Sequence, residues 1–385
     1  MKKMKQVLSM LAVLCMAVAS LSACGTKTSG GDTFYIGGSG PLTGDYAVYG
    51  LGVKNGAELA VNEINEAGGI NGKKIEFKYE DDEGDGEKAV NAYNTLRDAG
   101  MNIVMGTVTS GACANIIDKT NADGIFHLTP SASSTDVLAL GNVFQVCFTD
   151  PNQGIASAQY IKQNNVASKV AVIYDSSDIY SSGIYEKFAE EAANQGLEIV
   201  AVEAFTSDSK TDFFVQIQKA KDAGAELVFL PIYYKEASLI LTQSAALDYK
   251  PIYFGCDGLD GILTVDNFDT ALAEGVMLLT PFAADATDEL TVKFVTNYRA
   301  KYGDTPNQFA ADAYDAIYII KAAIEKSEAK PGMSISELGS ALKEAMVQIS
   351  VDGLTGLDMT WSETGEVNKA PKAVVIQNGT YVSAD

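Results

Sequence analysis

Short apolar runs alternate with segments of helical period through the first third of the chain. The strand candidates are the runs at 33–37, 74–79, 103–105 and 125–128. Between them lie helical patterns such as Val53, Ala57, Ala60 and Ile64, which ends at the glycine pair 68–69. This β-α-β-α-β-α-β order predicts a parallel sheet with helices on both faces.

A second set of the same kind follows. Its strand candidates are 169–174, 198–205, 226–232 and 251–254, and its helix candidates are 180–194, 211–222 and 236–247. The two halves share this pattern but no internal sequence repeat. We therefore expect an α/β protein with two doubly wound parallel-sheet lobes and a cleft between them.

The last third of the chain has a different pattern. It contains a candidate crossing strand at 275–282, amphipathic helices at 287–301, 309–326 and 334–347, and short strands at 357–360 and 373–377. Such a segment returns the chain to the first lobe and then to the second. We expect 33–150 with 281–373 to form one lobe, and 151–280 with 374–385 to form the other.

The first residues have the pattern of a bacterial lipoprotein signal peptide over 1–23. Three lysines precede the uncharged stretch 7–23, which is short for a spanning helix of roughly 20 apolar residues. Leu21-Ser22-Ala23-Cys24 resembles a lipobox, so we expect Cys24 to carry lipid, the polar segment 24–32 to act as a tether, and the body to sit on the outer face of the cytoplasmic membrane. The alternative is an ordinary signal peptide with an incidental cysteine.

Charge and cysteine content exclude some classes of protein. With 50 Asp and Glu against 28 Lys and Arg, the net charge of −22 disfavours nucleic acid and anionic membrane surfaces as partners. Beyond the signal only Cys113, Cys147 and Cys256 remain, which permits one disulfide at most, and we expect buried free thiols. The length suits two domains, and we expect a monomer.

Motifs for catalysis are absent from the sequence, so we expect no enzyme, cofactor or metal. The single histidine, His127, lies in an apolar strand pattern, and no G-x-S-x-G elbow, zinc cluster or phosphate-binding loop is present. The acidic run 81–85 lacks EF-hand spacing and is interpreted as a solvated loop. An acid pair for glycoside hydrolysis stays open as an alternative.

The residues after the strands favour ligand binding instead, because ligands of open α/β sheets sit beyond the carboxyl ends of strands. In the first half these loops offer hydroxyls and small residues, and in the second half they offer tyrosines and one carboxylate. The candidate ligand-binding residues are Tyr49, Ser110, Ser131, Ala132, Ser133, Tyr180, Tyr233 and Asp257. Donors, an acceptor and aromatic walls are what an amino-acid zwitterion needs.

The chain resembles the leucine/isoleucine/valine-binding proteins of branched-chain amino acid ABC transporters. The resemblance extends from about 34 to 382, and its ordered markers are PLTGDYAVYG, EINEAGGINGKKIEFKYEDDE, GTVTSG, LTPSASS, AVIYDSSDIYSSG, PIYYKEA, FGCDGLDG, QFAADAYDAI and LTGLDMTW. It implies a Venus-flytrap fold of the periplasmic-binding type I class, with three crossing strands between the lobes. It also implies that an ABC permease is the partner.

The resemblance further implies a role for individual residues. Ser110 and Ser133 match hydroxyls that hold the ligand carboxylate, and the Ser131 backbone matches a contact to the ammonium group. Tyr49, Tyr180 and Tyr233 match contacts to the ligand from the two lobes, and Asp257 matches the acidic partner of the ammonium group.

Three departures from the family pattern leave the ligand open. Asp257 stands where a glutamate is usual, Ser131 replaces an alanine, and a cysteine pair near 82–85 and Thr109 is missing. Relatives of this kind also take amides, urea or aromatic acids, and a sensor that presents its ligand to a signalling receptor is a further alternative.

Overall fold

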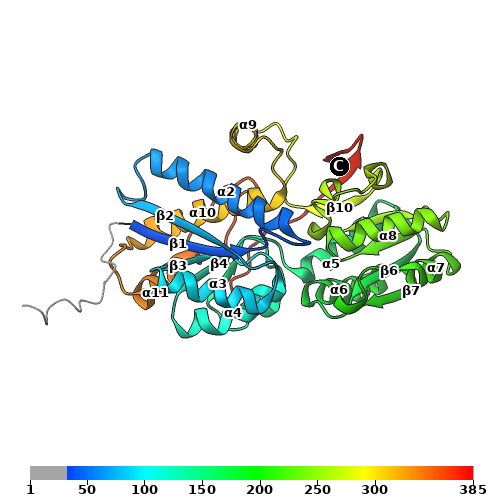
Figure 1. Cartoon of the computed structure of the whole chain (residues 1–385), viewed down its shortest axis with the longest axis horizontal. Helices are drawn as coiled ribbons and strands as arrows, with labels where there is room; N and C mark the ends of the chain where they lie inside the picture. The colour runs from blue at the N-terminus through cyan, green and yellow to red at the C-terminus, as the bar shows by residue number, and fades with distance from the viewer. Residues whose placement is uncertain (1–32, 385) are drawn as a thin grey trace, which may run out of the picture.

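The computed structural model describes residues 33–384. The predicted signal peptide, Cys24 and the tether lie outside the described residues. Figure 1 shows an elongated molecule with two lobes side by side, one carrying the N-terminal strands and the other the central third of the chain. Within 33–384, no helix combines the length and apolar character needed to cross a membrane.

The first lobe is built on a five-stranded parallel sheet of order β2-β1-β3-β4-β5. Its strands are β1 (Thr33–Gly40), β2 (Lys74–Asp81), β3 (Ile103–Met105), β4 (Phe126–Thr129) and β5 (Val143–Gln145). The first four confirm the sequence prediction. The pattern missed β5, whose three residues are too few to show a period.

Helices cover both faces of this sheet (Figure 1). They are α2 (Ala47–Glu66), α3 (Gly86–Asp98), α4 (Ser110–Ala122), α10 (Gln308–Ser327) and α11 (Ile335–Met346), with α9 (Glu289–Tyr302) packed outside α2. The helices α2 and α10 approach so closely that a Cβ on Gly56 would lie 2.0 Å from the carbonyl oxygen of Ala310. Glycine is therefore required at that contact.

The second lobe is built on a seven-stranded sheet of order β12-β11-β10-β9-β8-β6-β7. Its strands are β6 (Lys169–Asp175), β7 (Glu198–Phe205), β8 (Leu227–Leu230), β9 (Ile252–Gly255), β10 (Met277–Thr280), β11 (Lys372–Gln377) and β12 (Thr380–Ser383). The helices are α5 (Asp150–Gln163), α6 (Ile179–Gln195), α7 (Phe214–Asp222) and α8 (Tyr234–Ala246). Only the pairs β10–β11 and β11–β12 are antiparallel.

The chain passes three times between the two lobes. It leaves the first sheet after β5, returns after β10, and enters the second sheet again at β11. The exact domain limits given above stay a prediction. The expected strand at 357–360 is wrong: that region makes only isolated bridges, Val351 with Met359 and Trp361 with Val367.

The acidic run 81–85 is solvated as expected at Glu83 and Asp85, but the interpretation is wrong for Asp82. Asp82 is fully buried, and its carboxylate accepts hydrogen bonds from Ser39 Oγ at 2.8 Å and the Gly84 amide at 2.9 Å. Asp85 caps α3 by accepting from the Lys88 amide. These carboxylates hold the ends of β1, β2 and α3 together, because backbone and hydroxyl donors at chain turns need acceptors.

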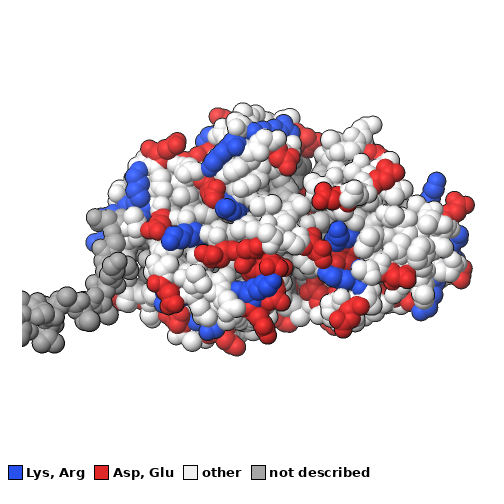
Figure 2. Space-filling model, viewed as in Figure 1, with Lys and Arg blue, Asp and Glu red and all other residues white. Residues whose placement is uncertain are grey.

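His127 and the three thiols confirm the expected core roles. His127 is fully buried beside the Gly106 carbonyl, and burial lowers its pKa to about 4. Cys113, Cys147 and Cys256 are buried and free. Acidic side chains spread over both lobes on the face in Figure 2, in keeping with the net charge of −22.

Candidate functional site

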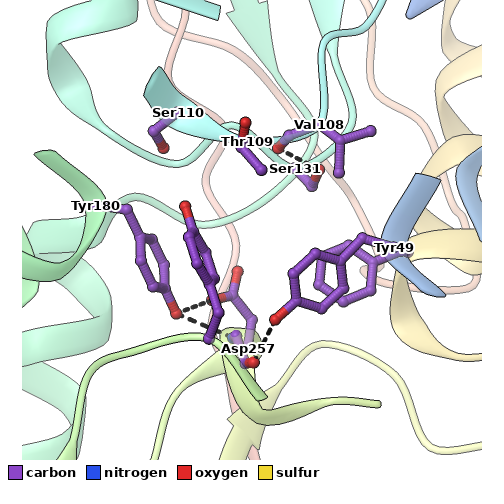
Figure 3. Close-up of a pocket in the computed structure, with 10 residues that line it drawn as sticks. Tyr49, Val108, Thr109, Ser110, Ser131, Tyr180 and Asp257 are labelled. Atoms are coloured by element: carbon purple, nitrogen blue, oxygen red, sulfur yellow. Dashed lines mark hydrogen bonds between the residues drawn. The ribbon is translucent and has the colours of Figure 1, made fainter. Parts of the chain in front are cut away.

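A small cavity lies between the lobes, at the carboxyl ends of strands from both sheets. It is lined by Tyr49, Val108, Thr109, Ser110, Ser131, Tyr180, Tyr233, Asp257, Gly258 and Phe309. Six of the eight predicted residues are therefore brought together, and Figure 3 shows serines on one side and Asp257 on the other. The cavity volume is about 20 Å³, which is room for roughly one water molecule.

The loop after β3 supplies one wall. It ends at Thr109, the N-cap of α4, and Ser110 begins the helix. The Ser110 hydroxyl accepts from the Ser134 amide at 3.1 Å, which leaves its hydrogen free to donate. Thr109 Oγ1 is buried without a hydrogen-bond partner among the described residues. Free hydroxyls at the positive end of a helix favour an anionic group.

The loop after β4 supplies the neighbouring wall. Ser131 Oγ donates to the Val108 carbonyl at 2.8 Å, so this hydroxyl ties the two loops together and has its hydrogen occupied. Ala132 and Ser133 lie fully buried behind the lining. The Ala132 amide donates to Thr129 Oγ1 at 3.0 Å. These two predicted residues support the loop instead of lining the cavity.

Asp257 is the acidic group of the second lobe. It follows β9, is 5 % exposed, and accepts from the Tyr180 hydroxyl at 2.7 Å through Oδ1. Figure 3 shows its other carboxylate oxygen turned toward the space between the tyrosines. Burial raises the Asp257 pKa to about 7, against the opposing effect of the Tyr180 hydrogen bond.

Four aromatic rings fill most of the cleft. Tyr49 of α2 contacts Phe309 of α10 with ring centroids 4.3 Å apart, and Tyr180 stacks on Tyr233 at 5.0 Å. Tyr49 also meets Tyr233 edge to face at 5.8 Å. Such walls favour a compact apolar or aromatic ligand part.

The structure adds a carboxylate that the sequence reasoning missed. Asp150, at the start of α5, is 1 % exposed and lies beside the Ser133 side chain and the Asp257 carboxyl. Burial raises the Asp150 pKa well above its usual range, and the neighbouring Asp257 carboxyl raises it further. Burial therefore favours the neutral form of Asp150, which leaves Asp257 as the carboxylate of the cavity lining.

Phe309 and Thr109 are further lining residues that the sequence reasoning did not select. Both lie in quoted motifs, QFAADAYDAI and GTVTSG, which were the available signals. Phe309 is far from the other lining residues in sequence, and only the packing of α10 against α2 brings it to Tyr49.

The chemistry of this site suits binding. In the described part of the chain, no group of three or more His, Cys, Asp or Glu residues is arranged to hold a metal ion. His127 lies in the core of the first lobe, within β4, and does not line the cavity. Hydroxyl donors on one side and a carboxylate on the other can orient a molecule that carries both charges.

Comparison with known proteins agrees with this geometry. The family model described as periplasmic binding protein matches residues 33–380. The chain is 31 % identical over 354 residues to Leu/Ile/Val-binding protein homolog 3 of Brucella melitensis, covering 91 % of this chain and 93 % of that protein.

Solved structures share the fold. The branched-chain amino acid transporter substrate-binding protein LivJ of Streptococcus pneumoniae, in complex with isoleucine, gives a TM-score of 0.82 at 28 % identity, covering 91 % of this chain and 98 % of that one. A solute-binding protein of Rhodopseudomonas palustris in complex with benzoate gives a TM-score of 0.80 at 20 % identity, covering 91 % and 95 %. At that identity the second likeness concerns the fold alone. The chain belongs to the periplasmic binding protein family, whose members are extracytoplasmic solute-binding proteins and not enzymes, and it is related to the Leu/Ile/Val-binding proteins.

Proposed function

We propose that this chain is the substrate-binding lipoprotein of an ABC importer and captures an amino acid, of the branched-chain type, between its lobes. The observation that carries the proposal is the placement of Asp257 across the cavity from Ser110 at the start of α4. Related proteins named for leucine, isoleucine and valine, and a neighbour in complex with isoleucine, support the same ligand class.

The charges at the two ends of the cavity match a zwitterion. The Ser110 hydroxyl and the first amides of α4 donate to the ligand carboxylate. Asp257 accepts from the ammonium group, which favours its ionised form. A ligand without a cationic group leaves the Asp257 carboxylate uncompensated, which opposes its binding.

The aromatic rings determine which ligand side chain fits. Tyr49, Phe309 and Tyr233 form a continuous apolar wall with few free polar groups, which suits a short branched aliphatic chain. Since about 20 Å³ is too small for any amino acid, the ligand enters while the lobes are apart, and the rings move to admit it. Ligand binding then shifts the population toward the closed form.

Location and partners follow from the same proposal. Lipid on Cys24 attaches the protein to the outer face of the cytoplasmic membrane, and the closed form docks on a membrane permease as a monomer. Mass spectrometry of the N-terminal peptide tests the lipid: a diacylglyceryl Cys24 supports it, and an unmodified peptide starting elsewhere rejects it.

Thermal melting of the purified protein against the twenty amino acids, urea, short amides and benzoate tests the ligand class. A ligand at a hundred times its dissociation constant stabilises the protein by roughly 2.7 kcal/mol. We expect shifts with leucine, isoleucine or valine. A shift only with benzoate or an amide would keep the binding role and reject the amino acid. No shift after unfolding and refolding to remove carried ligand would reject the tested ligands and favour a sensor or a partner-binding role.

A further inference from the structure

The mouth of the cleft carries a group of polar contacts that the ligand site does not use. Asp45 and Tyr46 lie at the start of α2 in the first lobe. Lys210, after β7, and Glu236, in the first turn of α8, lie in the second lobe. All four side chains meet, although 164 residues or more separate the two pairs in sequence.

The second lobe supplies a lysine–glutamate pair. Lys210 Nζ lies 3.4 Å from Glu236 Oε1, and the Glu236 side chain is only 4 % exposed. Its second oxygen, Oε2, has no hydrogen-bond partner among the described residues. Burial raises the Glu236 pKa, and the charge of Lys210 opposes that rise.

The first lobe inserts Tyr46 into that pair. The Tyr46 hydroxyl accepts from Lys210 Nζ at 3.2 Å and donates to Glu236 Oε1 at 3.1 Å. Lys210 Nζ also lies 3.2 Å from Asp45 Oδ2 and 5.2 Å from the centre of the Tyr46 ring. The hydroxyl therefore has both a donor and an acceptor partner, and both belong to the opposite lobe.

The same tyrosine reaches the ligand site through its ring. The Tyr46 ring lies 4.8 Å from Tyr233 and 6.2 Å from Tyr49, both of which line the cavity. The interlobe contacts of Tyr46 are therefore continuous with the aromatic walls of the cavity.

We propose that Asp45, Tyr46, Lys210 and Glu236 form an interlobe clasp, which assembles when the lobes close and slows release of the ligand. The clasp rests on the proposed function for its role in ligand release, but its assembly is a property of the chain alone. A partly buried charged contact between lobes contributes only to the closed state, so its loss acts on ligand dissociation more than on association.

Zero-length carbodiimide cross-linking of the full chain tests the assembly. This reagent joins a lysine to a carboxylate only at contact distance, and peptide mass spectrometry identifies the pair. We expect an Asp45–Lys210 product whose yield rises with leucine. The Lys219–Glu203 pair, at 2.8 Å within the second lobe, is the matched control and should be independent of leucine. Absence of the Asp45–Lys210 product, or a yield unaffected by leucine in a sample shown to bind it, would overturn the clasp.

Leucine dissociation measured by stopped flow tests the consequence. We expect Lys210→Ala to raise the dissociation rate about fivefold with little change in association rate, and Lys219→Ala to change neither. Equal rates in Lys210→Ala and wild type would reject the clasp while leaving the ligand assignment intact. If the wild type binds no amino acid, the proposed function fails, and small-angle scattering then tests the clasp. We expect Lys210→Ala to have a larger radius of gyration than Lys219→Ala. Equal radii would reject the clasp.

Discussion

The hydroxyl of Tyr49 in the first lobe lies 2.5 Å from the carbonyl oxygen of Gly258 in the second lobe. The same hydroxyl accepts from the Tyr234 amide at 3.3 Å. Both partners belong to the second lobe, and Tyr49 is only 1 % exposed. Tyr49 therefore lines the cavity and also links the two lobes. Its two hydrogen bonds can form only when the lobes are in contact.

Tyr49→Phe removes that hydrogen-bonding group and keeps the ring. In the closed state the Gly258 carbonyl and the Tyr234 amide lose a buried partner, whereas in the open state water satisfies both. We expect leucine affinity, measured by calorimetry, to fall about tenfold, because a buried polar group left without a partner costs roughly 1–3 kcal/mol. Tyr253→Phe is the control, since Tyr253 is a buried tyrosine of the second lobe outside the cavity lining, and the affinity of this variant should equal that of wild type. Equal losses in both variants would contradict the interlobe role.

Asp257→Asn separates ligand charge recognition from packing. The amide keeps the shape of the carboxylate but not its charge, so we expect leucine affinity to fall at least tenfold, about 1.4 kcal/mol. Asp315→Asn is the control. Asp315 is another buried carboxyl, outside the cavity lining, and burial raises its pKa to about 6. This variant should keep the wild-type affinity. Unchanged affinity in Asp257→Asn would reject this residue as the ammonium partner.

The same variant should be more stable than wild type without ligand at pH 8. The pKa of Asp257 is raised from 3.8 to about 7 in the folded protein, so the folded state keeps a proton that the unfolded state has released. The wild type therefore loses stability as pH rises from 3.8 to about 7, and it stays lower above that range. Denaturant titrations of both proteins at pH 4 and pH 8 check this. If the difference in free energy of unfolding between the variant and the wild type did not grow from pH 4 to pH 8, this would contradict the raised pKa of Asp257.

Leucine affinity should itself depend on pH. A bound ammonium group favours the ionised form of Asp257, so binding releases a proton whenever the free protein holds one. Above about pH 7 the carboxylate is already ionised and affinity is at its highest; below it, affinity should fall by up to tenfold per pH unit. Calorimetry in two buffers of different ionisation enthalpy at pH 6 should detect the released proton. In the Asp257→Asn variant, the part of the pH dependence and of the proton release that comes from Asp257 should be absent.

Lys369 forms a buried ion pair near the third crossing between lobes. Its Nζ lies 2.7 Å from Asp312 Oδ1, 2.9 Å from the Val146 carbonyl and 2.6 Å from Thr355 Oγ1, and the two charged side chains are 1 % and 3 % exposed. Lys369→Met leaves Asp312 buried and unpaired, which costs roughly 3–5 kcal/mol. We expect a clear fall in melting temperature.

Lys321→Met is the control for that variant. Lys321 pairs with Glu325 at 2.7 Å on the surface of α10, where the two side chains are 30 % and 41 % exposed, and such pairs contribute about 0.3–0.5 kcal/mol. If Lys321→Met destabilised the protein as much as Lys369→Met, burial would not be the cause of the loss.

The parallel strands of both sheets and most of the cavity lining could be predicted from the sequence alone. Strand and helix periods are local properties, and they located four strands of the first sheet and the main strands of the second. The rule that ligands lie beyond the carboxyl ends of strands then selected Ser110, Tyr180 and Asp257, because parallel strands bring those ends to one edge.

The contacts between distant segments could not be predicted from the sequence. The burial of Asp82 and of Asp150, the arrival of Phe309 beside Tyr49, and the contact of Tyr46 with Lys210 all depend on packing between segments that are far apart in sequence. A periodic pattern indicates which face of a helix or strand is apolar. It does not indicate which distant residue packs against that face. The charge state of a carboxyl depends on that partner and on the exclusion of water, so the chemistry of the cleft appears only when the lobes are assembled.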